Sequence, residues 1–129
     1  MGQQQLLLIV LGVIIVGIAI VVGINVFTSS AASSNRDSLV SSCATLGALA
    51  QLYYRKPTAL GGGSSTFTGW TVPATLSQTA NMSAVITSTV AAQTVTLVAV
   101  GTETGTDGST KTKVTMTVTS TGITTAINN

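Results

Sequence analysis

Charged residues are rare in this sequence, and histidine is absent. Only 6% of the 129 residues are Asp, Glu, Lys or Arg, against about a quarter in typical globular domains. The three acidic and five basic residues form no cluster of the kind that binds nucleic acid. Paired carboxylates, metal-ligand clusters and a Ser/His/Asp set are also missing. We therefore expect neither an enzyme nor a catalytic site, metal site, cofactor or nucleic-acid partner.

Cysteine and proline are nearly absent as well. Cys43 is the only cysteine, so no disulfide forms within the chain. The 73 residues from Pro57 onward are marginal for an independent core without such a crosslink. We expect support from the N-terminal part of the chain or from neighbouring subunits.

What is present is a long apolar run. Residues 1–27 carry no charged side chain, and Leu6 to Phe27 reads LLLIVLGVIIVGIAIVVGINVF. At about 1.5 Å per residue, a helix of this length crosses a hydrocarbon layer about 30 Å thick. Glycines interrupt the run but prolines do not, so we expect an unbroken helix.

Residues 28–56 are more polar but continue the helical pattern. An apolar stripe recurs at steps of four and three residues, which is one face of a helix. We predict a single helix from about Gln3 to about Lys56, ended by Pro57 and the glycines that follow. The stripe consists of Leu39, Cys43, Leu46, Ala50 and Tyr53.

Residues 57–129 contain 21 threonines and have a β-like pattern. Asp107-Gly108 is a hairpin signal between two alternating runs. We predict an α+β fold, in which the long N-terminal α-helix packs against a small C-terminal antiparallel β-sheet of four strands or five. One sheet face packs on the stripe, and threonines cover the other. The predicted strands are Phe67–Val72, at the edge, then Met82–Val90, Gln93–Val100, Lys113–Thr119 and Ile123–Ile127.

Two surface features of the β segment allow alternative interpretations. Asn81-Met82-Ser83 fits the N-glycosylation sequon, which makes Asn81 a candidate glycan acceptor. Glu103 and Asp107 flank the predicted hairpin tip, where carboxylates are usually solvated but also suit calcium.

The order of these segments resembles the type IV pilin superfamily, which includes bacterial pilins, pseudopilins, archaeal pilins and archaellins. The run GQQQLLLIVLGVIIVGIAIVVGI is similar to the N-terminal helix of a mature pilin. The resemblance is strong over about residues 1–55 and architectural beyond them. The proline that many bacterial pilins carry near the end of the apolar run is missing.

The resemblance implies how the N-terminus is made. A prepilin peptidase removes a short basic leader, and the new terminal residue is often methylated. If Met1 is that residue, the fifth position, usually glutamate, is Gln5, which offers an amide oxygen near a neighbour's N-terminus. Cleavage after Gly2 is the alternative, and it would displace Gln5 from the matching position.

The resemblance also implies a function. We expect the major structural subunit of an extracellular type IV pilus-like filament, held in the cytoplasmic membrane before assembly. Its partners are then copies of itself and, by resemblance, an assembly ATPase and membrane platform. The alternatives are a pseudopilin or archaellin, or a monomeric membrane-anchored β module that binds a ligand. The residues expected in the filament core are Leu6, Leu7, Ile9, Val10, Val13, Ile14, Ile18 and Val21.

Overall fold

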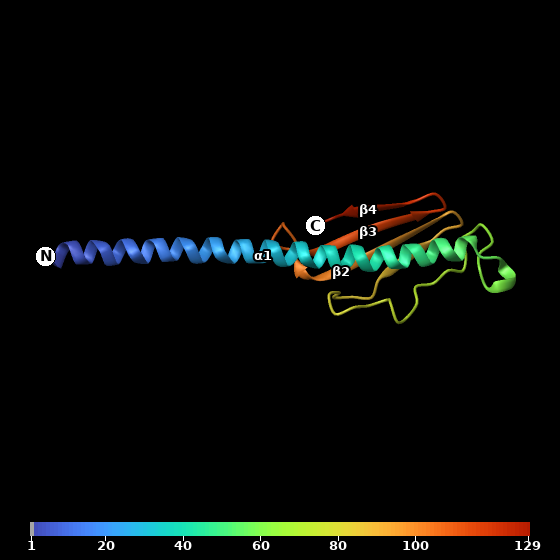
Figure 1. Cartoon of the computed structure of the whole chain (residues 1–129), viewed down its shortest axis with the longest axis horizontal. Coiled ribbons are helices and arrows are strands. Elements are labelled where there is room, and N and C mark those ends of the chain that lie inside the picture. Colours follow the sequence, from blue (N-terminus) through green and yellow to red (C-terminus); the bar gives the residue numbers. More distant parts are fainter. Residues whose placement is uncertain (1) are drawn as a thin grey trace.

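The computed structural model describes residues 2–129 and contains one long helix beside one small sheet. Helix α1 runs from Gly2 to Arg55 without a break, so it is about 80 Å long. Its N-terminal half projects alone, and its C-terminal half lies along the sheet (Figure 1). A 3-10 turn, Thr58–Leu60, follows directly after Pro57. The predicted continuous helix is confirmed, and its ends lie within one residue of those expected.

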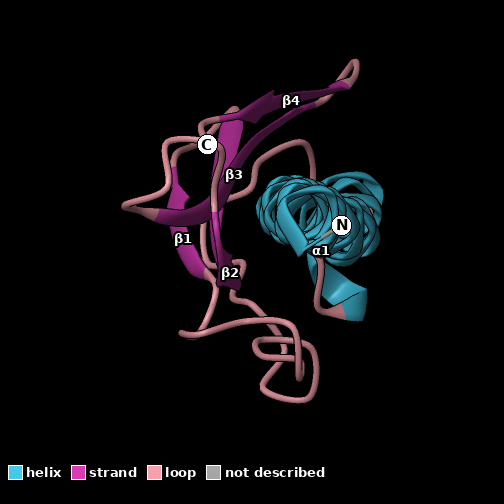
Figure 2. Cartoon of the chain, turned by 90° about the vertical axis from the view of Figure 1, so that its left-hand side faces the viewer, coloured by secondary structure: helices cyan, strands magenta, loops and turns pink. Residues whose placement is uncertain are grey.

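The sheet is an antiparallel meander of four strands in the order β1-β2-β3-β4. The strands are β1 (Thr87–Val90), β2 (Thr94–Thr104), β3 (Lys111–Thr119) and β4 (Ile123–Ile127). Helix α1 covers one face of this sheet, as Figure 2 shows looking along the helix. The predicted α+β fold is therefore confirmed.

Two predicted strands need correction. Residues 67–72 form a loop because Gly69 takes a φ of 87° and the N–H of Trp70 donates to the carbonyl of Phe67, which closes a tight turn. Residues 82–86 are not a strand either, because Met82 makes only an isolated bridge to Gly101. Strand β1 consequently begins at Thr87.

The core lies between α1 and the inner face of the sheet. Four of the five stripe residues are fully buried, and Tyr53 is half-buried. They meet alternate residues of the two central strands, since successive side chains of a strand point to opposite faces. The buried inner residues of β2 and β3 are Val95, Leu97, Ala99, Val114, Met116 and Val118.

The outer face of the sheet is rich in threonine, as the alternation predicted. Thr89 pairs with Thr96, Thr96 with Thr117, and Thr117 with Thr124, so one row of threonines crosses all four strands. These four side chains are exposed or half-buried. Strand β4, in contrast, is exposed along its whole length, including Ile123 and Ile127.

The burial of Cys43 has a chemical consequence. Desolvation raises the pKa of its thiol from 9.0 to about 11, because a low-dielectric environment disfavours the thiolate. A pKa that is raised by folding means that the folded state holds the proton more tightly. The protonated thiol therefore contributes to the free energy of unfolding. This contribution is complete below pH 9.0 and is lost as the pH rises to about 11.

We expect Cys43 to resist alkylation in the folded protein. At pH 8 its reaction with iodoacetamide should be about 100-fold slower than that of an exposed cysteine. The reason is that a thiol with a pKa of about 11 holds about 100-fold less reactive thiolate at this pH than one with a pKa of 9.0. Ala48→Cys places the exposed control on the same helix. Mass spectrometry counts the labels before and after unfolding. Equal rates at the two positions in the folded protein would contradict this prediction.

Candidate functional site: the projecting apolar helix

The N-terminal half of α1 is the most unusual surface of the molecule. Every residue from Gly2 to Ser30 is exposed. The helix is long and apolar enough to cross a membrane, and none of its most apolar stretch is buried in the chain. An isolated apolar helix of this size is unstable in water, since each large side chain removed from water contributes about 1.5–3 kcal/mol. This surface therefore needs a membrane or other protein around it.

The residues predicted for a filament core all lie on this surface. Their exposed fractions range from 53% at Ile14 to 69% at Leu7, with no sheltered face among them. An apolar helix that is exposed on all sides is typical of one surrounded by lipid or by other helices. The structure thus places these residues together on one helix, but none of residues 2–129 covers them.

The projecting half is joined rigidly to the sheet domain. The helix passes from its apolar half into the packed core without a linker. The β2–β3 loop reaches the helix where the apolar run ends, and a hollow of about 250 Å³ lies between them, lined by Asn25, Thr28, Ser29, Ala32, Gly105, Thr106 and Gly108. The sheet domain therefore begins at the end of the apolar half and has a fixed orientation relative to it.

A buried polar network holds the helix to the sheet, and no pattern in the sequence predicted it. The Asn35 Nδ2 donates to the carbonyl of Asn81 at 2.9 Å, and the Thr112 Oγ1 donates to the Asn35 Oδ1 at 2.5 Å. Gly101 makes room for both side chains, since a Cβ there would lie 1.8 Å from the Asn35 Oδ1. Buried polar groups that are paired in this way fix one register between packed elements.

Asn81, the candidate glycan acceptor, is part of the same region. It is exposed, yet its Nδ2 donates to the Ser38 Oγ at 2.7 Å. Glycosylation of Asn81 stays a prediction.

The carboxylate of Asp107 has a structural role at the β2–β3 turn. It accepts hydrogen bonds from the Thr110 hydroxyl and from the backbone N–H groups of Ser109 and Thr110. These hydrogen bonds hold the pKa of Asp107 well below its usual range, and the bond from the Thr110 hydroxyl has the largest effect. Among residues 2–129, no three His, Cys, Asp or Glu side chains gather as metal ligands would.

Gln5 lies exposed near the start of the projecting helix, and Met1 lies outside the described residues. The predicted role of Met1 as the processed terminus therefore stays a prediction. The same holds for the contact between Gln5 and a neighbour's N-terminus.

The chain matches no protein-family model, no curated protein and no solved structure. What the structure provides is an architecture: one long apolar N-terminal helix whose second half packs against a small antiparallel sheet. This architecture is compatible with a pilin-like fold.

Proposed function

We propose that this protein is the major structural subunit of an extracellular, type IV pilus-like filament. The observation that carries the proposal is the projecting half of α1, which is apolar and exposed on all sides. In the proposed cycle this half first lies in the cytoplasmic membrane and then moves into a bundle of identical helices. The sheet domain forms the outer layer of the filament.

The rigid link between the two halves of α1 favours a polymer subunit over a tethered binding module. A helical polymer repeats one set of contacts, so each subunit must hold its core helix and its outer domain in one fixed relation. A module that only displays a ligand site needs no rigid link, because a flexible linker displays the site equally well. Here the helix is continuous across the junction, and Asn35 locks the sheet to it.

The chemistry of the surface is consistent with this proposal. The described residues contain no clustered metal ligands, and the outer sheet face consists mainly of neutral threonines. Such a surface suits a structural role rather than catalysis. The family resemblance implies three further partners: a membrane platform, an assembly ATPase and a prepilin peptidase.

Electron microscopy of material sheared from the cell surface tests the proposed function. We expect thin filaments whose main protein is this chain of 12.9 kDa, identified by mass spectrometry of the purified filaments. Recovery of the chain only from the membrane fraction, as a detergent-solubilised monomer, would overturn the proposal and favour the anchored module. Short filaments confined to the cell envelope would instead favour a pseudopilin.

Gln5 provides a smaller test of the same proposal. We expect Gln5→Ala to reduce filament yield about fivefold, because one neutral hydrogen bond near a neighbour's N-terminus contributes about 1 kcal/mol. Gln3→Ala is the matched control and should leave the yield unchanged. Quantitative immunoblotting of sheared filaments measures both. Complete loss of filaments in Gln5→Ala would contradict the modest role given to this amide.

A further inference from the structure

Strand β4 is one edge of the sheet, and among residues 2–129 no backbone group bonds to its outer side. Successive residues of an antiparallel strand point their backbone N–H and C=O groups alternately to its two sides. The N–H of Asn128 donates to the carbonyl of Lys113 in β3, and the carbonyl of Gly122 accepts from the N–H of Thr119. Even-numbered residues of β4 therefore bond to β3, and odd-numbered residues point their backbone groups outward. These outward residues are Ile123, Thr125 and Ile127, all of them exposed.

Strand β1 is the opposite edge of the sheet, and its outer side is open as well. The N–H of Ala91 donates to the carbonyl of Thr94 in β2, so the odd-numbered residues of β1 bond to β2 and the even-numbered residues point outward. The segment before β1 does not cover this side. The N–H of Ser83 donates to the carbonyl of Val100 in β2, which places that segment in line with β1. The outward residues of β1 are Ser88 and Val90, so both edges of the sheet can accept a further strand.

Neither edge has the features that keep edge strands from pairing. Natural sheets protect exposed edges with charged side chains, proline or a bulge. Strand β1 reads TSTV and β4 reads ITTAI, without a charge or a proline, and both pair with their inner neighbours in unbroken register. On β4, Ile123 is 39% and Ile127 is 58% exposed. An apolar edge of this kind favours pairing with another chain.

We propose that β4 of one copy pairs antiparallel with β1 of a second copy. The four strands of the meander alternate in direction, so β1 and β4 run in opposite directions. Two copies whose helices point the same way therefore bring β4 and β1 together as antiparallel strands. Because α1 covers only one face of the sheet (Figure 2), this contact keeps both helices on one side of the joined sheet and both threonine faces on the other.

One register of this contact matches side chains on both faces of the joined sheet. It places Val90 opposite Ile123 and Ser88 opposite Thr125 on the helix side, and Thr89 opposite Thr124 on the outer side. A shift by one residue would put unlike faces together. Ser88 and Val90 each exchange two backbone hydrogen bonds with the residue opposite. The Thr–Thr and Ser–Thr pairs stabilise the strands, and the Val–Ile pair removes apolar surface from water.

This contact repeats from copy to copy, because it joins two different edges and leaves one β1 and one β4 free at the ends. All projecting halves of α1 then point the same way on the inner side, as the proposed function, on which this step rests, requires. The strands run oblique to α1 in Figure 1, and such a tilt lets a sheet curve around an axis. A symmetric β4–β4 pair would need antiparallel copies with their projecting halves in opposite directions, and it would stop at a dimer.

A proline on the open side of β4 tests the pairing. Thr125→Pro removes an N–H that points away from β3, and an edge strand tolerates proline in this orientation. We expect the yield of sheared filaments to fall at least about tenfold, because the proline removes a hydrogen bond at every contact and its ring blocks the incoming strand. Thr125→Val, which keeps the N–H and the strand preference, should stay within about twofold of the unmodified chain. Trp70 fluorescence of the detergent-solubilised chain checks that both variants fold, and a normal filament yield from Thr125→Pro would overturn the pairing.

Disulfide formation tests the register while every backbone group is kept. Thr89 and Thr124 are exposed at opposite edges of one sheet, about 14 Å apart at three strand spacings, so cysteines there cannot join within one chain. Across the proposed contact they form a non-hydrogen-bonded pair with Cα atoms about 4.5 Å apart, which suits a disulfide. Mild oxidation of T89C/T124C filaments should therefore give a ladder of dimers, trimers and longer species on non-reducing denaturing gels.

Two controls accompany the crosslinking. In T89C/T125C one cysteine moves by a single position, which turns its side chain to the other face of the sheet, so no ladder should form. T89C alone and T124C alone should remain monomeric, which also controls for the buried Cys43.

The outcomes separate this contact from the proposed function. A ladder from T89C/T124C supports the pairing of β4 with β1, whereas a product that stops at the dimer indicates a closed pair and overturns it. Filaments of T89C/T124C without any crosslinked species also overturn the contact but leave the proposed function standing. Absence of filaments from the unmodified chain would overturn the proposed function itself.

Discussion

Ile18→Asp is expected to abolish filaments. Ile18 lies near the centre of the apolar run and is 61% exposed in the isolated chain, so in the proposed filament other apolar helices would surround it. A carboxylate there has no partner, and burial of an unpaired charge costs far more than a packing contact returns. Ile15→Asp should act in the same way. Electron microscopy and immunoblotting of sheared material measure the loss.

The control separates assembly from membrane insertion. Ile18→Leu keeps the apolar character and should form filaments normally. One aspartate at the centre of a membrane helix costs about 2.5–3.5 kcal/mol, while the remaining apolar residues still favour insertion. The Ile18→Asp chain should therefore accumulate in the membrane fraction. Filaments at the normal yield from this variant would show that the projecting helix is not their core.

Leu46→Ala is expected to lower the free energy of unfolding of the sheet domain by about 2–5 kcal/mol. Leu46 is fully buried between the helix and the sheet. Its truncation loses apolar burial and leaves a cavity, which together account for losses of this size. Trp70, the only tryptophan, is 7% exposed and packs in the same core, so its fluorescence follows unfolding of the detergent-solubilised chain.

Leu52→Ala is the matched control for this measurement. It makes the same chemical change six residues further along the helix, on the opposite face, where Leu52 is 62% exposed. Its effect on monomer stability should stay within about 0.5 kcal/mol. Equal losses in the two variants would contradict the assignment of the core to one face of α1.

The two variants also distinguish the two halves of the molecule. Ile18→Asp should leave the sheet domain as stable as before, because no residue of that domain contacts the projecting helix near position 18. Leu46→Ala should lower domain stability and leave the apolar surface unchanged. Filament yield and domain stability are thus expected to respond independently.

Helix α1 is the element that the sequence determined most completely. Its apolar run, the lack of proline before Pro57 and the stripe from Leu39 to Tyr53 are local signals, and the helix follows them to within a residue at each end. The helix also needs no distant contact over residues 2–30, which makes its start independent of the rest of the fold. The inner faces of β2 and β3 were equally predictable, because alternation is a property of neighbouring residues.

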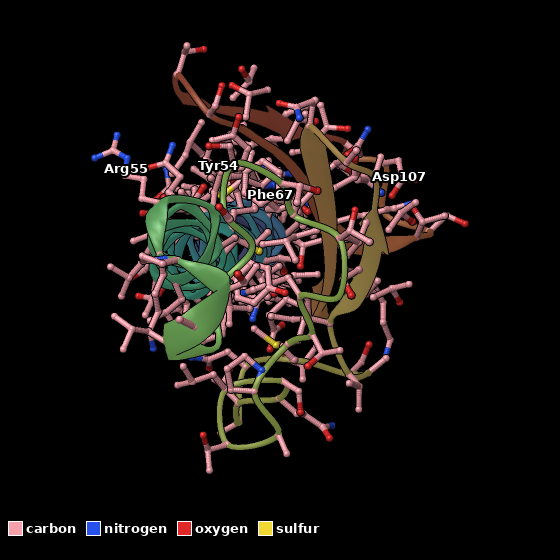
Figure 3. The ribbon with its side chains drawn as sticks, turned by 90° about the vertical axis from the view of Figure 1, so that its right-hand side faces the viewer. Tyr54, Arg55, Phe67 and Asp107 are labelled. Carbon is pink, nitrogen blue, oxygen red and sulfur yellow. The ribbon has the colours of Figure 1, made fainter. Side chains whose placement is uncertain are left out.

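Tertiary structure decided what depends on distant partners. Phe67 is fully buried although it lies in a loop, where its ring packs against that of Tyr54 with the ring centroids 4.8 Å apart and the ring planes tilted by 40° (Figure 3). Asn35, a polar helix residue, is buried with hydrogen-bond partners from distant parts of the chain: the Thr112 hydroxyl, 77 positions away, and the carbonyl of Asn81. Patterns in a sequence report forces that act over a few residues, whereas these contacts depend on how whole elements dock. The same docking fixes which side of α1 the sheet covers, and the order of the strands leaves β1 and β4 as the two open edges of the sheet.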